Sequence, residues 1–182
     1  MGLTSIFLTG HPGVGKTTVV ERVVYALMSR GLRVGGMITK EVREGGKRIG
    51  FEILDIESGV RGWLAHVKRE DGPVIGRYRV NLRDLEDVGV RALIRSIEEA
   101  DIIVCDEIGP MERTSSRFRE VIVEVLASGK PFIATLHHRY SEDLVEEVRC
   151  ASQFNIIKIT YTNRDILPLH VTSLVLKEIR GS

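Results

Sequence analysis

The chain has 182 residues, of which 28% are charged, and its 26 lysines and arginines nearly balance 25 acidic residues. This length suits one α/β core rather than two domains, and the balanced charge gives no overall positive field for nucleic acid. Every apolar run falls short of the ~18 residues that cross a bilayer. We therefore expect a cytoplasmic protein that binds neither membrane nor nucleic acid, and the sequence identifies no protein partner. Neither Cys105 nor Cys150 has a CxxC neighbour, so neither zinc nor a redox motif is indicated.

The first apolar run ends in a glycine-rich loop. Gly10–Thr17 fits the pattern G-x-x-x-x-G-K-[ST] at every constrained position. Glycines allow consecutive N–H groups to point at phosphate oxygens, and the following helix adds its positive N-terminal dipole. We expect Lys16 to reach the β- and γ-phosphates and the Thr17 hydroxyl to ligate Mg²⁺. The residues expected to bind nucleotide here are Gly10, His11, Pro12, Gly13, Val14, Gly15, Lys16, Thr17 and Thr18.

The region after this loop is predicted to contain a helix, a strand and an antiparallel meander. Apolar spacing predicts a helix over Lys16–Ser29 that ends at Gly31. A strand over Val34–Thr39 follows, and its Gly35-Gly36 pair indicates a close approach of the backbone to another group. From about 41 to 80, short alternating runs separated by glycine turns predict a meander inserted into, or extending, the sheet. Its strands are expected at Arg48–Leu54, Val60–Val67 and Val74–Val80.

Basic residues gather in and near the meander. A solvated sheet face is the favoured interpretation of this cluster, and a patch that binds phosphate or a partner is the alternative. The residues are Lys40, Arg43, Lys47, Arg48 and Arg61.

Strands and helices alternate along the rest of the chain. Outside the meander this alternation predicts a mainly parallel sheet with helices on both faces, in a single domain over residues 1–182. A final helix is expected over Asp165–Arg180, with Pro168 in its first turn. The other predicted elements are a helix over Leu82–Ala100, a strand over Asp101–Asp106, a helix over Phe118–Leu126, a strand over Phe132–Leu136, a short helix starting at Ser141, and a strand over Phe154–Tyr161.

Asp106 and Glu107 close the apolar strand that begins at Asp101. In an open α/β sheet, ligands bind at the carboxyl ends of the strands. An aspartate there holds Mg²⁺ opposite the P-loop hydroxyl, and a glutamate beside it can orient a water aimed at the γ-phosphorus. We expect Asp106 and Thr17 to hold the metal, and Glu107 and Lys16 to be catalytic. The pair favours hydrolysis, although either carboxylate could instead cap the turn that follows.

Further polar groups follow the neighbouring strands. Thr135 and His137 could touch the γ-phosphate or the attacking water, or simply form a polar strand exit. Asn163 and Arg164 could contact the base or ribose, or their turn could cap the last helix. The sequence around them lacks the spacing of the guanine-reading motif of small GTPases. Three arginines are candidates for an arginine finger, with an ordinary surface role as the alternative: Arg43, Arg113 and Arg139.

Several motifs now occur together in a characteristic order. After the P-loop come Gly35-Gly36 with Thr39-Lys40-Glu41-Val42-Arg43, then Arg48-Ile49-Gly50-Phe51, Asp106-Glu107-Ile108-Gly109-Pro110-Met111-Glu112, and Asn163-Arg164. On these residues the chain resembles the THEP1 family of nucleoside-triphosphatases, which also includes the human cancer-related NTPase. The resemblance implies a RecA-like P-loop fold in which a strand lies between the P-loop strand and the Asp-Glu strand. It also implies that the segment from Asp106 through Ile108 and Gly109 binds nucleotide.

The function implied is Mg²⁺-dependent hydrolysis of ATP, GTP, CTP and UTP to nucleoside diphosphate and phosphate. Broad base tolerance follows if recognition centres on the triphosphate and the metal. Two alternatives stay open at this point. One is a nucleotide or nucleoside kinase whose acceptor binds in the meander. The other is a slow NTP-dependent switch, or a subunit that acts with a partner.

Overall fold

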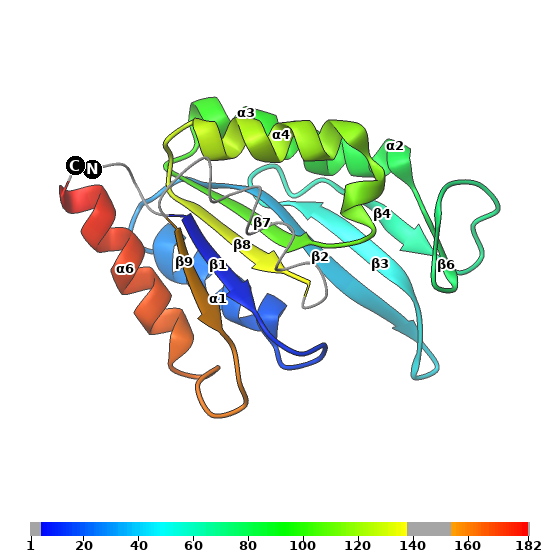
Figure 1. Ribbon diagram of the computed structural model, residues 1–182, viewed down its shortest axis with the longest axis horizontal. Helices are drawn as coiled ribbons and strands as arrows, with labels where there is room; N and C mark the ends of the chain where they lie inside the picture. Colours follow the sequence, from blue (N-terminus) through cyan, green and yellow to red (C-terminus); the bar gives the residue numbers. More distant parts are fainter. Residues whose placement is uncertain (1–4, 138–153, 182) are drawn as a thin grey trace.

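The computed structural model describes residues 5–137 and 154–181, and within them the strands form one sheet (Figure 1). Nine strands lie in the order β5-β6-β4-β3-β2-β7-β8-β1-β9. The strands are β1 (Ser5–Thr9), β2 (Val34–Glu44), β3 (Lys47–Asp55), β4 (Arg61–His66), β5 (Val74–Ile75), β6 (Tyr78–Val80), β7 (Ile102–Ile108), β8 (Phe132–Leu136) and β9 (Phe154–Lys158). The helical segments are α1 (Lys16–Met28), α2 (Leu82–Asp84), the π-helical η1 (Leu85–Val90), α3 (Arg91–Glu99), the 3₁₀-helical η2 (Glu112–Thr114), α4 (Ser116–Ala127) and α6 (Leu167–Gly181).

The strands β2, β7, β8, β1 and β9 form the parallel half of the sheet. β8 lies between the P-loop strand β1 and the Asp-Glu strand β7, as the resemblance implies. In this register Leu8 pairs with Thr135, and Ile38 pairs with Asp106. Because the strands are parallel, the P-loop and the acidic pair come to the same edge of the sheet.

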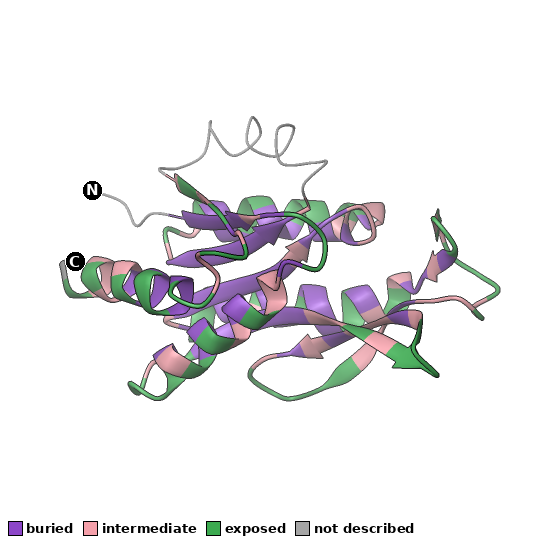
Figure 2. Ribbon diagram, turned by 90° about the horizontal axis from the view of Figure 1, so that it is seen from below, coloured by how far each residue is buried: buried purple, intermediate pink, exposed green. Residues whose placement is uncertain are grey.

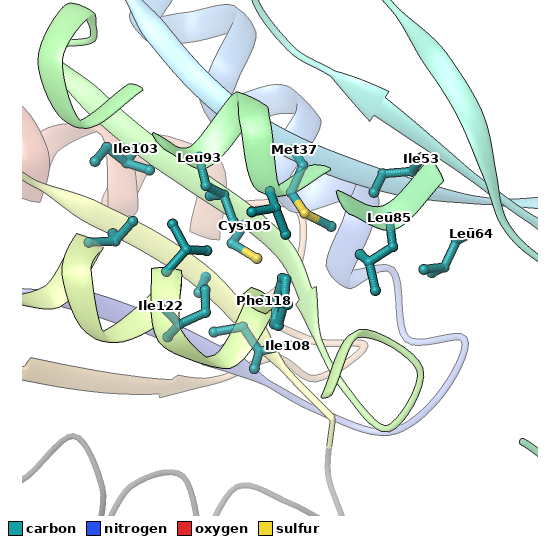
Figure 3. Close-up of a cluster of buried hydrophobic side chains, with 14 of the residues drawn as sticks. Met37, Ile53, Leu64, Leu85, Leu93, Ile103, Cys105, Ile108, Phe118 and Ile122 are labelled. Carbon is teal, nitrogen blue, oxygen red and sulfur yellow. The ribbon is translucent and has the colours of Figure 1, made fainter. Parts of the chain in front are cut away.

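Helices cover both faces of the parallel half, so the predicted three-layer α/β fold is confirmed. α1 and α6 lie on one face, and α3 and α4 lie on the other (Figure 1). Figure 2 shows that the buried residues are concentrated where the helices meet the sheet. In the cluster under α3 and α4, Leu93, Cys105 and Phe118 are fully buried (Figure 3). Cys105 is therefore a small apolar core residue, and Cys150 lies outside the described residues.

The antiparallel meander is present, and its largest differences from the prediction lie at β2 and at the last predicted strand. β2 continues to Glu44 instead of ending at Thr39, because its outer half pairs with β3 through a tight turn. Gly45 and Gly46 form this turn with φ values of 53° and 77°, which favour glycine. The predicted strand Val74–Val80 is instead a hairpin of β5 and β6 that turns at Gly76.

The basic residues of the meander pair with nearby carboxylates. Arg48 lies 2.7 Å from Glu41, and Arg61 lies 3.3 Å from Glu52. Arg43 also pairs with Glu41, and Lys40 pairs with Glu21 on α1. These contacts support the interpretation of the cluster as a solvated face.

Glycine is required at the predicted close approach. A Cβ on Gly36 would lie 2.0 Å from the carbonyl oxygen of Val104, and the φ of Gly36 is +108°. A Cβ on Gly35 would lie 2.2 Å from the Ser96 hydroxyl. β2 can therefore pair with β7 and pack under α3 only because these positions carry no side chain.

The predicted helix over Leu82–Ala100 is broken by the π-helical segment η1. Gly89 lies in this segment, where a Cβ would come within 2.5 Å of the Ile53 side chain and 2.9 Å of the Met37 sulfur. The chain thus packs closely on β2 and β3 at Gly89, a tertiary constraint that apolar spacing does not reveal.

The last strand and helix are shorter than predicted. β9 ends at Lys158, whose carbonyl oxygen accepts from Asn163 Nδ2, and the nearby Thr160 N–H donates to Asn163 Oδ1. The last helix, α6, accordingly begins at Leu167, with Pro168 in its first turn as expected. The predicted helix at Ser141 lies outside the described residues. In the part of the chain that the structure describes, no helix has the length and apolarity needed to cross a bilayer.

Candidate active site

The glycine-rich loop connects β1 to α1, as predicted, and is held by its own backbone geometry. Gly13 and Gly15 have φ values of 78° and 106°, which strain other residues. Val14 is buried and fixes the loop on the core. A Cβ on Gly10 would lie 2.8 Å from a backbone carbonyl oxygen. Because the N-cap residue of α1 is Gly15, which has no side chain to accept from them, the first N–H groups of the helix are available to phosphate oxygens.

Lys16 begins α1 and links the loop to the acidic pair. Its Nζ donates to the Gly10 carbonyl oxygen at 3.3 Å and lies 3.4 Å from Glu107 Oε2. The lysine side chain is only 10% exposed, and that of Glu107 is 23% exposed. The sequence pattern placed both residues in one site, and the structure brings them together.

Asp106 lies buried beside the loop, at the end of β7. The Thr135 hydroxyl donates to Asp106 Oδ1. Burial raises the pKa of Asp106 to about 6, against the lowering effect of the Thr135 and Thr17 hydroxyls. Asp106 Oδ2 is buried and has no hydrogen-bond partner among the described residues. An unsatisfied buried carboxylate oxygen next to a threonine hydroxyl suits a cation.

The donor set fits Mg²⁺ rather than a metal held wholly by protein. Within residues 5–137 and 154–181, no group of three or more His, Cys, Asp and Glu side chains is placed to hold a metal ion. Mg²⁺ keeps several waters and is bound through one or two protein oxygens plus substrate phosphates. Thr17 and Asp106 provide that number of protein oxygens.

An open pocket of about 240 Å³ lies beside the loop. Its lining includes Arg164, whose guanidinium donates to the Val14 carbonyl oxygen at 3.4 Å and lies 5.2 Å from the centre of the Tyr161 ring. Asn163 instead stabilises the turn after β9: its Oδ1 accepts from the Thr160 N–H at 2.8 Å, and its Nδ2 donates to a backbone carbonyl. The remaining lining residues are Gly15, Thr18, Val19, Arg22 and Asp165.

Comparison with known proteins shows which family the chain belongs to. The model of a family described as NTPase matches residues 5–172. A nucleoside-triphosphatase THEP1 from Thermofilum pendens is 44% identical over 169 residues, which cover 92% of this chain and 93% of that protein. The chain belongs to the THEP1 family of nucleoside-triphosphatases.

A further THEP1 relative and two solved structures are also similar to this chain over most of its length. The Methanocaldococcus jannaschii THEP1 is 47% identical over 136 residues, covering 74% of this chain and 79% of that protein. The crystal structure of THEP1 from Aquifex aeolicus matches with a TM-score of 0.83 and 32% identity, over 94% of this chain and 99% of that one. The solution structure of a human cancer-related nucleoside triphosphatase matches with a TM-score of 0.80 and 34% identity, over 96% and 98%. The predicted resemblance and P-loop fold are confirmed.

Among the candidate finger and sensor residues of this THEP1-family protein, Thr135 contacts the acidic pair by donating to Asp106. Arg43 donates to the Gly46 carbonyl oxygen at 2.9 Å and pairs with Glu41, so it is held at the β2–β3 hairpin. Arg113 lies in η2, after the acidic pair. The His137 N–H donates to a backbone carbonyl of β7 at 3.3 Å. Arg139 lies outside the described residues.

Glu112 is a further buried acidic residue near the site, and its sequence position alone predicts no role for it. This residue is 4% exposed, and its Oε2 accepts from the Gly109 N–H at 3.1 Å. Burial and the charges of Glu107 and Asp106 raise the pKa of Glu112 to about 8. The Gly109 backbone is therefore held by an acidic side chain. In the sequence, the only indication is that an acidic residue lies in the short segment between a buried strand and a helix. The burial of Glu112 depends on how that segment turns, which the sequence does not show.

Proposed function

We propose that the protein hydrolyses ATP, GTP, CTP and UTP to nucleoside diphosphate and phosphate in a reaction that requires Mg²⁺. The observation that carries this proposal is the position of Lys16 Nζ, 3.3 Å from the Gly10 carbonyl oxygen and 3.4 Å from Glu107 Oε2. A phosphate-binding lysine beside an acidic pair is the arrangement that phosphoanhydride hydrolysis needs. The names of the relatives, nucleoside-triphosphatase THEP1, support the same activity.

Binding of the triphosphate would be shared by backbone and side chain. The N–H groups of the loop and of the first turn of α1 would donate to phosphate oxygens, and Lys16 would add a positive charge. Thr17 and the Oδ2 atom of Asp106 would hold Mg²⁺, which neutralises charge on the transferring phosphoryl group when bound. Thr135 would keep the Asp106 carboxylate in orientation through its hydrogen bond.

Glu107 is proposed to position the attacking water. Once the Lys16 ammonium interacts with phosphate, the Glu107 carboxylate can accept a hydrogen bond from a water near the γ-phosphorus. As the oxygen–phosphorus bond forms, Glu107 would take a proton from that water. The nucleoside diphosphate leaves with the electron pair of the broken phosphoanhydride bond.

Broad base tolerance is proposed from the contacts of the turn after β9. The Asn163 amide bonds to the Thr160 N–H and the Lys158 carbonyl, so both of its ends are already used within the turn. Arg164 and Arg22 line the neighbouring pocket and carry positive charge, which attracts phosphate and the π-faces of bases without reading a base edge. Recognition would therefore rest on the triphosphate and the metal.

The test is phosphate release by the purified protein from each of the four triphosphates, offered separately without an acceptor. One set of reactions contains Mg²⁺ and a matched set contains EDTA. The proposal predicts multiple turnovers on several bases with Mg²⁺ and none with EDTA. Nucleotide binding without phosphate release would contradict it and favour a kinase or a partner-dependent switch.

A further inference from the structure

The turn between β7 and α4 is fixed at both ends. At its start, Gly109 accepts a hydrogen bond through its carbonyl oxygen from the Arg113 N–H at 3.1 Å. At its end, the Ser115 hydroxyl accepts from the Phe118 N–H at 3.1 Å and donates to Glu86 of η1 at 2.7 Å. The segment that directly follows β7, the strand that carries Glu107, is thus attached to a helix N-terminus and to the neighbouring helical layer.

Glu112 occupies the inside of this turn. Its side chain is buried, and its Oε2 accepts from the Gly109 N–H at 3.1 Å. A Cβ placed on Gly109 would lie 3.0 Å from Glu107 Oε1 and 3.1 Å from Glu112 Oε2. The carboxyl groups of Glu107 and Glu112 therefore both border the same small space at Gly109, and a side chain there would disturb both.

We propose that Glu112 is a positioning residue for hydrolysis, whose buried carboxyl holds the Gly109 backbone and thereby sets where the Glu107 carboxylate lies. The inference rests on the proposed nucleoside-triphosphatase function and adds a residue to it. Glu112 does not itself contact the reacting atoms. It acts through Gly109, because that backbone lies between the two carboxyl groups.

The charge around Glu112 favours its neutral form. Asp106 and Glu107 already place negative charge nearby, and burial disfavours a third ionised carboxyl. A neutral carboxyl accepts a hydrogen bond from the Gly109 N–H without adding electrostatic repulsion against Glu107. The titratable and charged groups around it are Cys105, Asp106 and Glu107 of β7, Arg113 of η2, Glu86 of η1 through Ser115, and His137 after β8.

A glutamine at position 112 mimics the neutral acid. Its amide oxygen accepts the same hydrogen bond, and its amide nitrogen donates as a carboxylic O–H does. An alanine removes the acceptor and leaves the buried Gly109 N–H without its partner. The two variants therefore separate the hydrogen bond from the charge.

The experiment measures kcat and KM for Mg·ATP in wild type, Glu112→Ala, Glu112→Gln and the exposed control Glu120→Ala on α4. We expect Glu112→Ala to lose about 10- to 100-fold in kcat, as when a group that orients a catalytic side chain is removed. Its KM, and its affinity for a non-hydrolysable ATP analogue, should stay near wild type. Glu112→Gln should keep kcat within about threefold, because it accepts the same hydrogen bond.

Melting temperatures serve as the folding control. If Glu112→Ala does not fold, Glu112→Leu supplies the test, because a leucine fills most of the buried space but accepts no hydrogen bond from the Gly109 N–H, and it should lower kcat without lowering analogue affinity. Unchanged kcat in the folded Glu112→Ala or in Glu112→Leu would overturn the inference, as would equal loss in Glu112→Ala and Glu112→Gln. Absence of phosphate release by wild type would instead overturn the proposed function, and this inference with it.

Discussion

The ammonium of Lys16 lies 3.4 Å from the carboxylate of Glu107, so the two side chains form an ion pair. In the proposed reaction, Lys16 binds phosphate and Glu107 activates the attacking water. A bound triphosphate would offer the lysine a stronger set of anionic oxygens. Its binding would then release the glutamate to interact with water. In the proposed reaction, this ion pair would connect substrate binding to the availability of Glu107 as the base.

The proposed contact between Lys16 and phosphate is tested by Lys16→Ala. We expect the affinity for Mg·ATP to fall by about 10²-fold or more, because charge-assisted hydrogen bonds contribute about 1.5–3 kcal/mol each. Isothermal titration with a non-hydrolysable analogue measures this. Lys47→Ala, at an exposed position at the start of β3, is the matched control and should bind as wild type does. Equal affinity of the two variants would contradict the assignment of Lys16.

The role of Thr135 is tested through the magnesium requirement. Thr135→Val removes the hydroxyl that donates to Asp106 while keeping the side-chain shape. The Mg²⁺ concentration at half-maximal phosphate release should rise about 10- to 100-fold, since groups that orient a metal ligand have effects of this size. Thr135→Ser keeps a hydroxyl and should remain close to wild type. An unchanged magnesium dependence of Thr135→Val would show that Asp106 needs no such support.

The ion pair between Asp55 and Arg95 is expected to stabilise the fold without serving catalysis. Asp55 is 4% exposed, and both of its carboxylate oxygens accept from Arg95, at 2.7 and 2.8 Å. Burial opposes ionisation, but hydrogen bonds from Arg95 and Ser58 hold the pKa of Asp55 below its usual value. Arg95→Ala would leave the carboxylate buried without its counter-charge and lower the free energy of unfolding by about 2–4 kcal/mol.

Urea unfolding measures the effect of Arg95→Ala, with Arg91→Ala as the control. Arg91 lies on the same helix in an exposed pair with Asp87, so its loss should cost about 0.5 kcal/mol or less. Because the folded pKa of Asp55 is lowered, the stabilisation is present above the unfolded pKa and lost as the pH falls through the folded pKa. The difference between wild type and Arg95→Ala should therefore shrink in acid. A difference independent of pH would contradict this account.

The stabilisation by Glu112 should have the opposite pH dependence to that by Asp55. Its pKa is raised from 4.5 to about 8 on folding, so the stabilisation is complete below pH 4.5 and is lost as the pH rises through about 8. Wild type should lose up to about 1.4 kcal/mol per pH unit in this window relative to Glu112→Gln, which does not titrate. Melting temperatures of the two proteins from pH 5 to 8.5 test this. Parallel curves would show that Glu112 titrates like an exposed carboxyl.

The sequence alone predicted the elements whose signals are local. The P-loop at Gly10–Thr17 and the acidic pair near the end of β7 are contiguous motifs, so their position at one sheet edge follows from parallel pairing. The extension of β2 to Glu44 and the π-helical turn at Gly89 depend on what packs against them, namely β3 and the Ile53 side chain. Neither partner is visible in the local pattern.

Within the site, Glu107 is recognisable from the local sequence, whereas Glu112 is not. Glu107 directly follows an aspartate at a strand end, which is a recognisable position. The importance of Glu112 depends on its burial and on its hydrogen bond to Gly109, and both arise only when the turn folds back. For Asn163 the sequence left nucleotide contact and helix capping open, and the structure places its side chain in the turn after β9.

The most direct test of the proposed reaction compares wild type with Glu107→Gln in phosphate release and in binding of a non-hydrolysable ATP analogue. Glutamine keeps the shape of the side chain but cannot accept a proton from water. We expect Glu107→Gln to bind Mg·nucleotide at least as well as wild type and to lose about 10²–10⁴-fold in turnover. Turnover by Glu107→Gln equal to that of wild type would contradict the account, because Glu107 would then have no part in activating the water.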